Sequence, residues 1–212
     1  MRRALFGLAA TTVTLLALAG TASAASGQVT HFRFTGTFAN AFWFTSSATS
    51  ATGTSISVSK SRQGSRLFVE QFTSNYDTNG NITGSTDTSV VVTSGFSFAL
   101  RQPLASASLS GSGLPATTCT YDANFNQIGC SATTVDVTAA WTGQGPILRG
   151  VSNLHFKTDG FSETDHSNGT DRNAVATGTF NGDTLTASEL QYADLGTTNS
   201  GSIYVCIGTS CQ

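Results

Sequence analysis

The sequence predicts an all-β, antiparallel fold of about eleven strands that closes into a strongly curved barrel, with a β-sandwich as the alternative. The first observation is alternation, because apolar side chains share one parity from Phe32 to Phe44 and from Val90 to Leu100. The second is that both patterns continue across a glycine, Gly36 or Gly95, as in strands that bend. The third is that no segment after the N-terminal region has the periodicity of an amphipathic helix. Long bent strands favour closure, so the barrel is preferred.

Residues 1–24 predict a secretory signal peptide, and residues 25–212 predict a single all-β domain. Two arginines precede an apolar run from Ala4 to Leu18, and Ala22-Ser23-Ala24 supplies the small residues of a cleavage site. The apolar run is short and leads directly to that site, so no stable membrane insertion is expected. No proline-rich, serine-rich or charged linker divides the rest of the chain. A secreted, extracellular protein cleaved after Ala24 is therefore predicted.

The first long strand has one face of phenylalanines and another that carries Trp43. Because side chains alternate across a strand, we expect the phenylalanines to form the core face and Trp43 to lie opposite. An exposed indole can stack on a sugar ring and offers its N–H as a polar handle, so Trp43 is a candidate ligand-binding residue. A loop that covers the indole is the alternative. The expected core face contains Phe32, Phe34, Phe38, Phe42 and Phe44.

Four cysteines in an exported chain favour two disulfides. Cys119 and Cys130 flank a turn at residues 123–126, so a hairpin would place them opposite one another. Cys206 and Cys211 enclose a loop short enough for a second local bridge, and the crossed pairings stay open. No Cys/His spacing of a zinc site occurs, so neither a metal nor a cofactor is predicted.

The pattern of residues 135–156 predicts a long β-hairpin whose two strands are connected at residues 143–146. We treat this hairpin as the central motif of the predicted fold. In this register Trp141 lies opposite Leu148, and the face that they share is apolar. Trp141 is therefore expected to belong to the core.

The polar face of this predicted hairpin holds the best candidates for catalysis. Asp136 would lie opposite Asn153, with His155 one pair beyond. A carboxylate beside an imidazole orients the ring and raises its pKa, which suits general acid–base chemistry. The alternative is that these are ordinary solvated residues of an exposed strand face. No specific catalytic motif, such as G-x-S-x-G or H-E-x-x-H, occurs in the chain.

The remaining segments alternate between strands and turns. Between Thr158 and Asn173 the periodicity disappears and acidic residues gather, which predicts the longest loop. Its carboxylates could ligate calcium, but the spacing matches no EF-hand, and a solvated loop is the alternative. The other expected strands lie near residues 56–58, 66–76, 105–109, 174–180, 184–190 and 202–207.

One further set of motifs consists of Trp141-Thr142-Gly143, Gly145-Pro146, Leu148-Arg149-Gly150 and the stretches 152–156 and 37–42. In these motifs the chain resembles a group of short secreted bacterial proteins of unknown function. The resemblance implies an exported β-rich protein of bacterial type. It brings no catalytic residues with it.

Charge and composition limit the function. The chain has 10 Lys and Arg against 12 Asp and Glu and no basic cluster, so nucleic acid is not expected as a partner. We predict a secreted, non-catalytic binding or surface-interaction protein with an unknown extracellular ligand, for instance a glycan. The alternative is a small extracellular hydrolase or isomerase that uses His155 and Asp136 in a barrel mouth. Neither the ligand nor the oligomeric state follows from the sequence.

Overall fold

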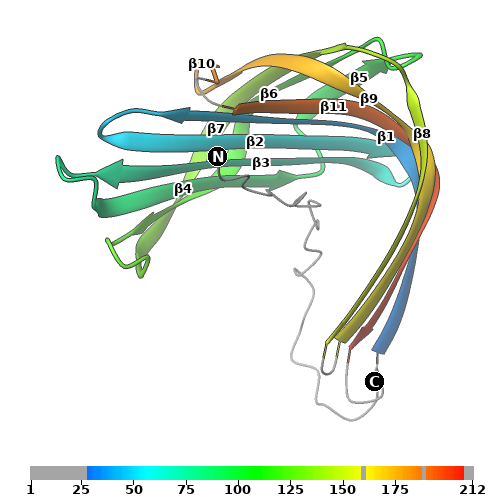
Figure 1. Ribbon diagram of the computed structural model, residues 1–212, viewed down its shortest axis with the longest axis horizontal. Coiled ribbons are helices and arrows are strands. Elements are labelled where there is room, and N and C mark those ends of the chain that lie inside the picture. The colour runs from blue at the N-terminus through cyan, green and yellow to red at the C-terminus, as the bar shows by residue number, and fades with distance from the viewer. Residues whose placement is uncertain (1–27, 159–160, 188–189, 208–212) are drawn as a thin grey trace, which may run out of the picture.

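The computed structural model describes residues 28–158, 161–187 and 190–207 (Figure 1). Within these ranges the chain forms β-strands joined by short turns, and no helix there is long and apolar enough to cross a membrane. The strands are β1 (Gln28–Ser46), β2 (Ser50–Ser61), β3 (Gly64–Tyr76), β4 (Ile82–Val92), β5 (Phe96–Arg101), β6 (Ser106–Tyr121), β7 (Gln127–Gly143), β8 (Leu148–Thr158), β9 (Phe161–Phe180), β10 (Asp183–Leu185) and β11 (Leu190–Ile207).

Eight of these strands form a hydrogen-bonded ring whose neighbours are all antiparallel. The order around the ring is β1, β2, β3, β4, β6, β7, β9 and β11, and β11 pairs with β1 to close it. The predicted all-β antiparallel fold is confirmed, as one continuous sheet instead of the two sheets of a sandwich. The strands of the ring range from 11 residues in β4 to 20 in β9, so the ring is not an even barrel.

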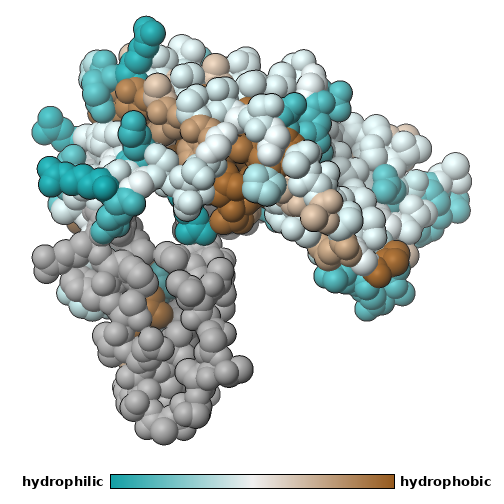
Figure 2. All heavy atoms as spheres, turned by 180° about the vertical axis from the view of Figure 1, so that it is seen from behind, coloured by the Kyte–Doolittle hydropathy of each residue, from teal (hydrophilic) through white to brown (hydrophobic). Residues whose placement is uncertain are grey.

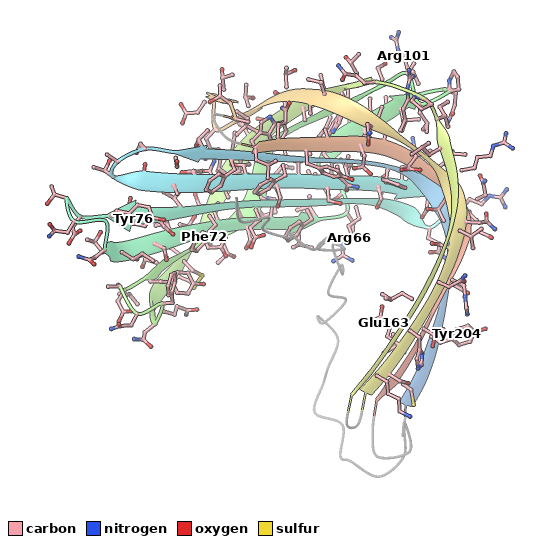
Figure 3. The ribbon with its side chains drawn as sticks, in the orientation of Figure 1. Arg66, Phe72, Tyr76, Arg101, Glu163 and Tyr204 are labelled. Carbon is pink, nitrogen blue, oxygen red and sulfur yellow. A yellow bond between two sulfur atoms is a disulfide. The ribbon has the colours of Figure 1, made fainter. Side chains whose placement is uncertain are left out.

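Parts of β1, β9 and β11 extend beyond the ring and form a ribbon with β8. β2 pairs with β1 only from Gly36 to Ser46, and β7 pairs with β9 only from Ala174 to Phe180. Figure 1 shows the ribbon bending away from the ring, which gives the protein the shape of an arch. We call the inner side of the arch, toward which Phe72 and Glu163 point in Figure 3, the concave face. The outer side of the ribbon, toward which Tyr204 points, is the convex face.

The core lies inside the ring and uses the odd positions of β1. Ala39, Ala41 and Trp43 are all buried, and Trp43 is only 2% exposed. Trp141 of β7 enters from across the ring, and its Nε1 donates a hydrogen bond to the carbonyl oxygen of Asn40 at 2.7 Å. The small alanines leave room for the two indoles in an interior that must be filled by side chains at close packing.

The expectation that the phenylalanines form the core face of β1 is wrong. Phe38, Phe42 and Phe44 lie on the outer face of the ring and are partly buried there. Phe38 covers Gly196 of β11, where a Cβ atom would collide with the phenylalanine ring. Both faces of β1 are apolar, so alternation separates the two faces without showing which one the ring encloses. The side chains of Phe32 and Phe34 lie outside the described part.

The predicted hairpin of residues 135–156 does not form. β7 pairs with β6 along one edge and with β9 along the other, and β8 pairs with β9 instead. Because both edges of β7 are occupied, the strand that follows it in sequence is displaced onto the ribbon, where Leu148 and Leu154 are exposed. The apolar face predicted for β7 is nevertheless confirmed. Its buried residues are Val135, Val137, Ala139 and Trp141.

Two other predicted elements also differ from the structure. The acidic segment expected as a loop between Thr158 and Asn173 belongs largely to β9, which pairs with β8 and β11 on its two sides. Both faces of this ribbon are exposed to solvent, so the sequence of this segment shows no alternation of apolar and polar residues. The strand expected from Val90 to Leu100 is divided at Gly95, whose φ of 84° suits glycine. Its two halves, β4 and β5, follow one another along one edge of β6.

The disulfide predicted between Cys119 and Cys130 is confirmed. β6 and β7 place the two residues directly opposite each other, and the S–S distance is 2.02 Å. Cys211 lies outside the described residues, so the bridge between Cys206 and Cys211 stays a prediction.

Removing the first bridge should destabilise the protein without preventing folding. The double variant Cys119→Ala/Cys130→Ala opens a loop with a sequence separation of 11 residues. We expect the free energy of unfolding to fall by roughly 2–3 kcal/mol, because the unfolded chain regains the freedom that the bridge removes. Thermal unfolding followed by circular dichroism measures the effect. A melting temperature equal to that of the wild type would contradict this prediction.

Candidate functional site

The concave face of β1, β2 and β3 holds a pocket of about 320 Å³. The strand register places Phe44, Gly53 and Phe72 in one row across the three strands. A Cβ atom at Gly53 would lie 3.4 Å from the ring of Phe42 and 3.9 Å from that of Phe44. Because glycine has no side chain, the space between these two rings at the base of the pocket stays empty. The pocket is lined by Phe42, Phe44, Ala51, Gly53, Ser55, Glu70, Phe72, Ser74 and Tyr76.

Four rings make this pocket mainly aromatic, and we call Phe42, Phe44, Phe72 and Tyr76 the aromatic pocket. Phe72 is 36% exposed, and the other three rings are partly buried. Figure 3 shows Phe72 and Tyr76 pointing to the concave side of the arch. Partly exposed rings beside serine hydroxyls and a carboxyl group suit a ligand that has both apolar faces and hydroxyl groups.

Another exposed apolar area lies at the tip of the β6–β7 hairpin. Figure 2 shows this tip from behind, at the lower right of the molecule. Phe125 and Ile128 are exposed there. They stand on the end of a single hairpin, and neither residue lines the aromatic pocket, so Phe125 is a suitable reference for an exposed phenylalanine outside that pocket.

Two carboxyl groups lie beside the aromatic pocket. Glu70 lines it, and Asp87 of β4 lies opposite Phe72, so the two acids are diagonal neighbours on one face of the sheet. Burial raises the pKa of Glu70, and the nearby charge of Asp87 raises it further. Burial also raises the pKa of Asp87. Both groups therefore keep their protons to a higher pH than exposed carboxyl groups do.

Asp194 of β11 is a third acid on the outer side of the ring. It is 8% exposed and lies between Asn40 and Asn173 in the strand register. Burial is the main reason that the pKa of Asp194 is raised to about 6. Hydrogen bonds with Asn40 and Tyr192 lower this pKa, and the charge of Asp171 raises it. Its Oδ1 atom has no hydrogen-bond partner within the described ranges. The surroundings of Asp194 thus favour its neutral form.

The convex side of the ribbon carries a second, more polar pocket of about 350 Å³. His166 lies opposite Asn153, with its Nδ1 atom 2.6 Å from the amide oxygen Oδ1. His155 lies further along β8, with its Nδ1 atom 2.9 Å from Oγ1 of Thr164. Each histidine therefore contacts a neutral partner on the adjacent strand. The pocket is lined by Val151, Asn153, His166, Ser167, Asn168, Ser200, Gly201 and Ser202.

The predicted group of Asp136, Asn153 and His155 is not assembled. Asp136 lies on β7 in the ring, whereas Asn153 and His155 lie on β8, which does not pair with β7. The carboxylate of Asp136 accepts hydrogen bonds from Oγ of Ser112 at 2.6 Å and from the backbone N–H of Gly113 at 2.7 Å. These bonds, the one from Ser112 first, lower its pKa. Asp136 thus holds the segment of β6 between Gly111 and Leu114, where the register with β7 shifts, and the proposed pair with His155 is wrong.

Trp43 is not available for stacking on a sugar. It lies inside the ring, opposite Thr54 of β2 and Gln191 of β11. The expectation of an exposed indole is wrong, because the ring encloses the face of β1 that carries Trp43. The residues on either side of it, Phe42 and Phe44, line the concave pocket instead.

The aromatic pocket does not follow from the pattern of β1, but β3 carries a signal of it. Leu67 and Val69 occupy one face of β3, and Phe68 and Phe72 the other. A strand that has two apolar faces in a ring with a single interior must turn one of them outward. Apolar residues on both faces of a strand, with aromatic residues on one of the two, are therefore the pattern that indicates such a surface.

Within the described ranges, no group of three or more His, Cys, Asp or Glu side chains could hold a metal ion. Comparison with known protein families, with curated proteins and with solved structures finds no match to this chain.

Proposed function

We propose that this protein is a secreted, non-catalytic binding protein whose aromatic pocket takes an uncharged, hydroxyl-rich ligand of the glycan class. The observation that carries the proposal is the partly exposed row of rings on the concave face, with Phe72 at its most open point. Sugar rings present C–H groups on their faces and hydroxyl groups at their edges. Aromatic side chains stack on such faces, while neighbouring polar groups bind the hydroxyls.

The polar groups around the pocket fit this class of ligand. Glu70 offers carboxylate oxygens that accept hydrogen bonds from hydroxyls, and Ser55 offers a hydroxyl that both donates and accepts. An uncharged ligand is neither attracted nor repelled by the formal net charge of −2 of the full sequence, so its binding would depend on stacking and hydrogen bonds. The closed ring serves as a rigid, barrel-like support, which limits the entropy lost when a ligand binds.

A secreted location belongs to the same proposal. The N-terminal sequence has the three regions of an export signal. The bridge between Cys119 and Cys130 agrees with an oxidising compartment.

The proposal is tested by affinity electrophoresis through gels that contain neutral polysaccharides, namely a soluble cellulose derivative, xylan, mixed-linkage β-glucan and a soluble chitin derivative. The wild type should be retarded in at least one of these gels. Phe72→Ala should weaken that retardation about tenfold, because the loss of one stacked ring is worth on the order of 1.4 kcal/mol. Phe125→Ala, at the exposed hairpin tip, should bind as the wild type does. If no gel retards the wild type, or if both variants lose binding equally, the glycan proposal fails.

A hydrolase is the second candidate, because two carboxyl groups with raised pKa lie beside the aromatic pocket. Glycoside hydrolysis uses one protonated and one ionised carboxyl group. Glu70 and Asp87 are diagonal neighbours that oppose each other's ionisation, which is the electrostatic condition for such a division of roles. Release of reducing ends from the same polysaccharides, with an acidic pH optimum and loss of activity in Glu70→Gln, would favour this candidate. Binding without any release of reducing ends would favour the non-catalytic one.

A further inference from the structure

β8 is an edge strand of the ribbon. It pairs with β9 along one side from Leu148 to Thr158, and no described strand pairs with its other side. In an antiparallel pair, every second residue turns its backbone N–H and C=O groups away from the partner. β8 therefore presents a row of backbone donors and acceptors that can pair with another strand.

Among the described side chains of this edge strand, three apolar ones are exposed. Val151 is 74% exposed, and Leu148 and Leu154 are exposed on either side of it. Each leucine is three residues from Val151, so the apolar positions are arranged symmetrically about the valine. Soluble proteins usually protect an edge strand with charges, prolines or bulges, whereas the centre of β8 has an apolar residue and a glycine.

We propose that β8 pairs with β8 of a second copy of this chain, antiparallel, with Val151 opposite Val151 at a two-fold axis. In this register Leu148 lies opposite Leu154 of the other copy, and the same pair occurs twice because of the symmetry. Cross-strand apolar pairs stabilise a sheet, and all three exposed apolar residues obtain an apolar partner. The pairing is self-complementary, as an interface with two-fold symmetry requires.

The polar residues of β8 select the same register. With Val151 at the axis, Arg149 lies opposite Asn153, so no two cations face each other. With the axis one residue further along, Arg149 would face His155 and Val151 would face Asn153. With the axis two residues further along, Arg149 would face Lys157, a like-charge pair that destabilises a sheet. Of these three registers, only the one centred on Val151 pairs apolar residues with apolar residues and keeps the cations apart.

This pairing joins the two ribbons into one continuous sheet. Because the two-fold axis is perpendicular to the sheet, both concave faces lie on the same side of the dimer. The interface uses both β8 edges completely, so the assembly closes at two copies.

Sedimentation velocity over a concentration series of the full secreted protein tests the proposal. The weight-average mass of the wild type should rise toward twice that of the monomer. Val151→Lys should raise the dimer dissociation constant at least tenfold, because two ammonium groups would then face each other at the axis. The matched control is Val91→Lys, since Val91 is 57% exposed on β4 and should leave the dimer unchanged. A wild type that stays monomeric at all concentrations, or a Val151→Lys variant that dimerises normally, would overturn the proposal.

Cysteine cross-linking tests the register. Val151→Cys should form a disulfide-linked dimer on oxidation, because opposite residues bring their Cβ atoms within bonding range. Leu148→Cys and Leu154→Cys should each stay uncrosslinked alone and should crosslink when the two variants are mixed. Crosslinking of Leu148→Cys with itself, or none in the mixture, would show that the strands pair differently or not at all.

Discussion

Replacing Trp141 with alanine is expected to lower the free energy of unfolding by about 3–5 kcal/mol, through loss of buried contacts and the cavity that remains. Trp141 is 1% exposed. Its Nε1–H bond to the carbonyl oxygen of Asn40 links β7 to β1, two strands that are not neighbours in the ring. Because a domain of this size is stable by roughly 5–15 kcal/mol, the loss is a large part of the total. Urea unfolding followed by circular dichroism measures it.

Two further variants make this test specific. His155→Ala on exposed β8 should change the free energy of unfolding by less than about 1 kcal/mol, since the side chain lies outside the core. Trp141→Phe keeps much of the ring volume and removes the hydrogen bond to Asn40, so its loss should lie between the other two. An effect of Trp141→Ala as small as that of His155→Ala would show that the indole does not support the ring.

Replacing Asp194 with asparagine should stabilise the protein at neutral pH by about 3 kcal/mol and should have little effect near pH 4. The pKa of Asp194 is raised from 3.8 to about 6, so the folded state binds its proton more tightly than the unfolded state. Its contribution to stability is therefore fully present below about pH 4 and is lost as the pH rises through about 6. An asparagine stays neutral and avoids this loss.

Urea unfolding of the wild type and of Asp194→Asn at several pH values between 4 and about 7.5 measures this difference. Comparison at each pH removes the contributions of Glu70 and Asp87, whose pKa values are raised in both proteins. Asp136→Asn is the control of opposite sign, because hydrogen bonds lower the pKa of Asp136, so its ionised form stabilises the folded state as the pH rises. Destabilisation by Asp194→Asn at neutral pH would mean that the charged form is the one the fold requires.

Several features of the fold follow from short-range patterns. The β6–β7 hairpin and its disulfide could be predicted because Cys119 and Cys130 lie symmetrically about one turn. The buried face of β7 could be predicted because its apolar residues, including Trp141, all share one parity. In both cases the spacing along the chain determines which side chains meet, whatever the rest of the protein does.

The candidate site depended on contacts that no local pattern contains. Phe42 and Phe44 alternate with Trp43 on a strand whose two faces are both apolar. The closure of β11 onto β1 and of β7 onto β9 decided which face became the interior. The small side chains of Ala39 and Ala41 left space for indoles inside, and the phenylalanines were left on the concave side.

The sequence by itself determined the all-β antiparallel class and the separation of each strand into two faces, and it favoured the first disulfide, because each depends on a period of two residues or on a single turn. Only the tertiary structure decided that β8 pairs with β9 and not with β7, which also places Asp136 and His155 on strands that do not pair. It likewise decided that the acidic segment after Phe161 becomes part of a paired strand. The reason is that pairing between strands distant in the chain is selected by the closure of the whole ring. β7 already pairs with β6 through their hairpin, and its other edge gains more from the distant β9 than from β8, which follows β7 in sequence.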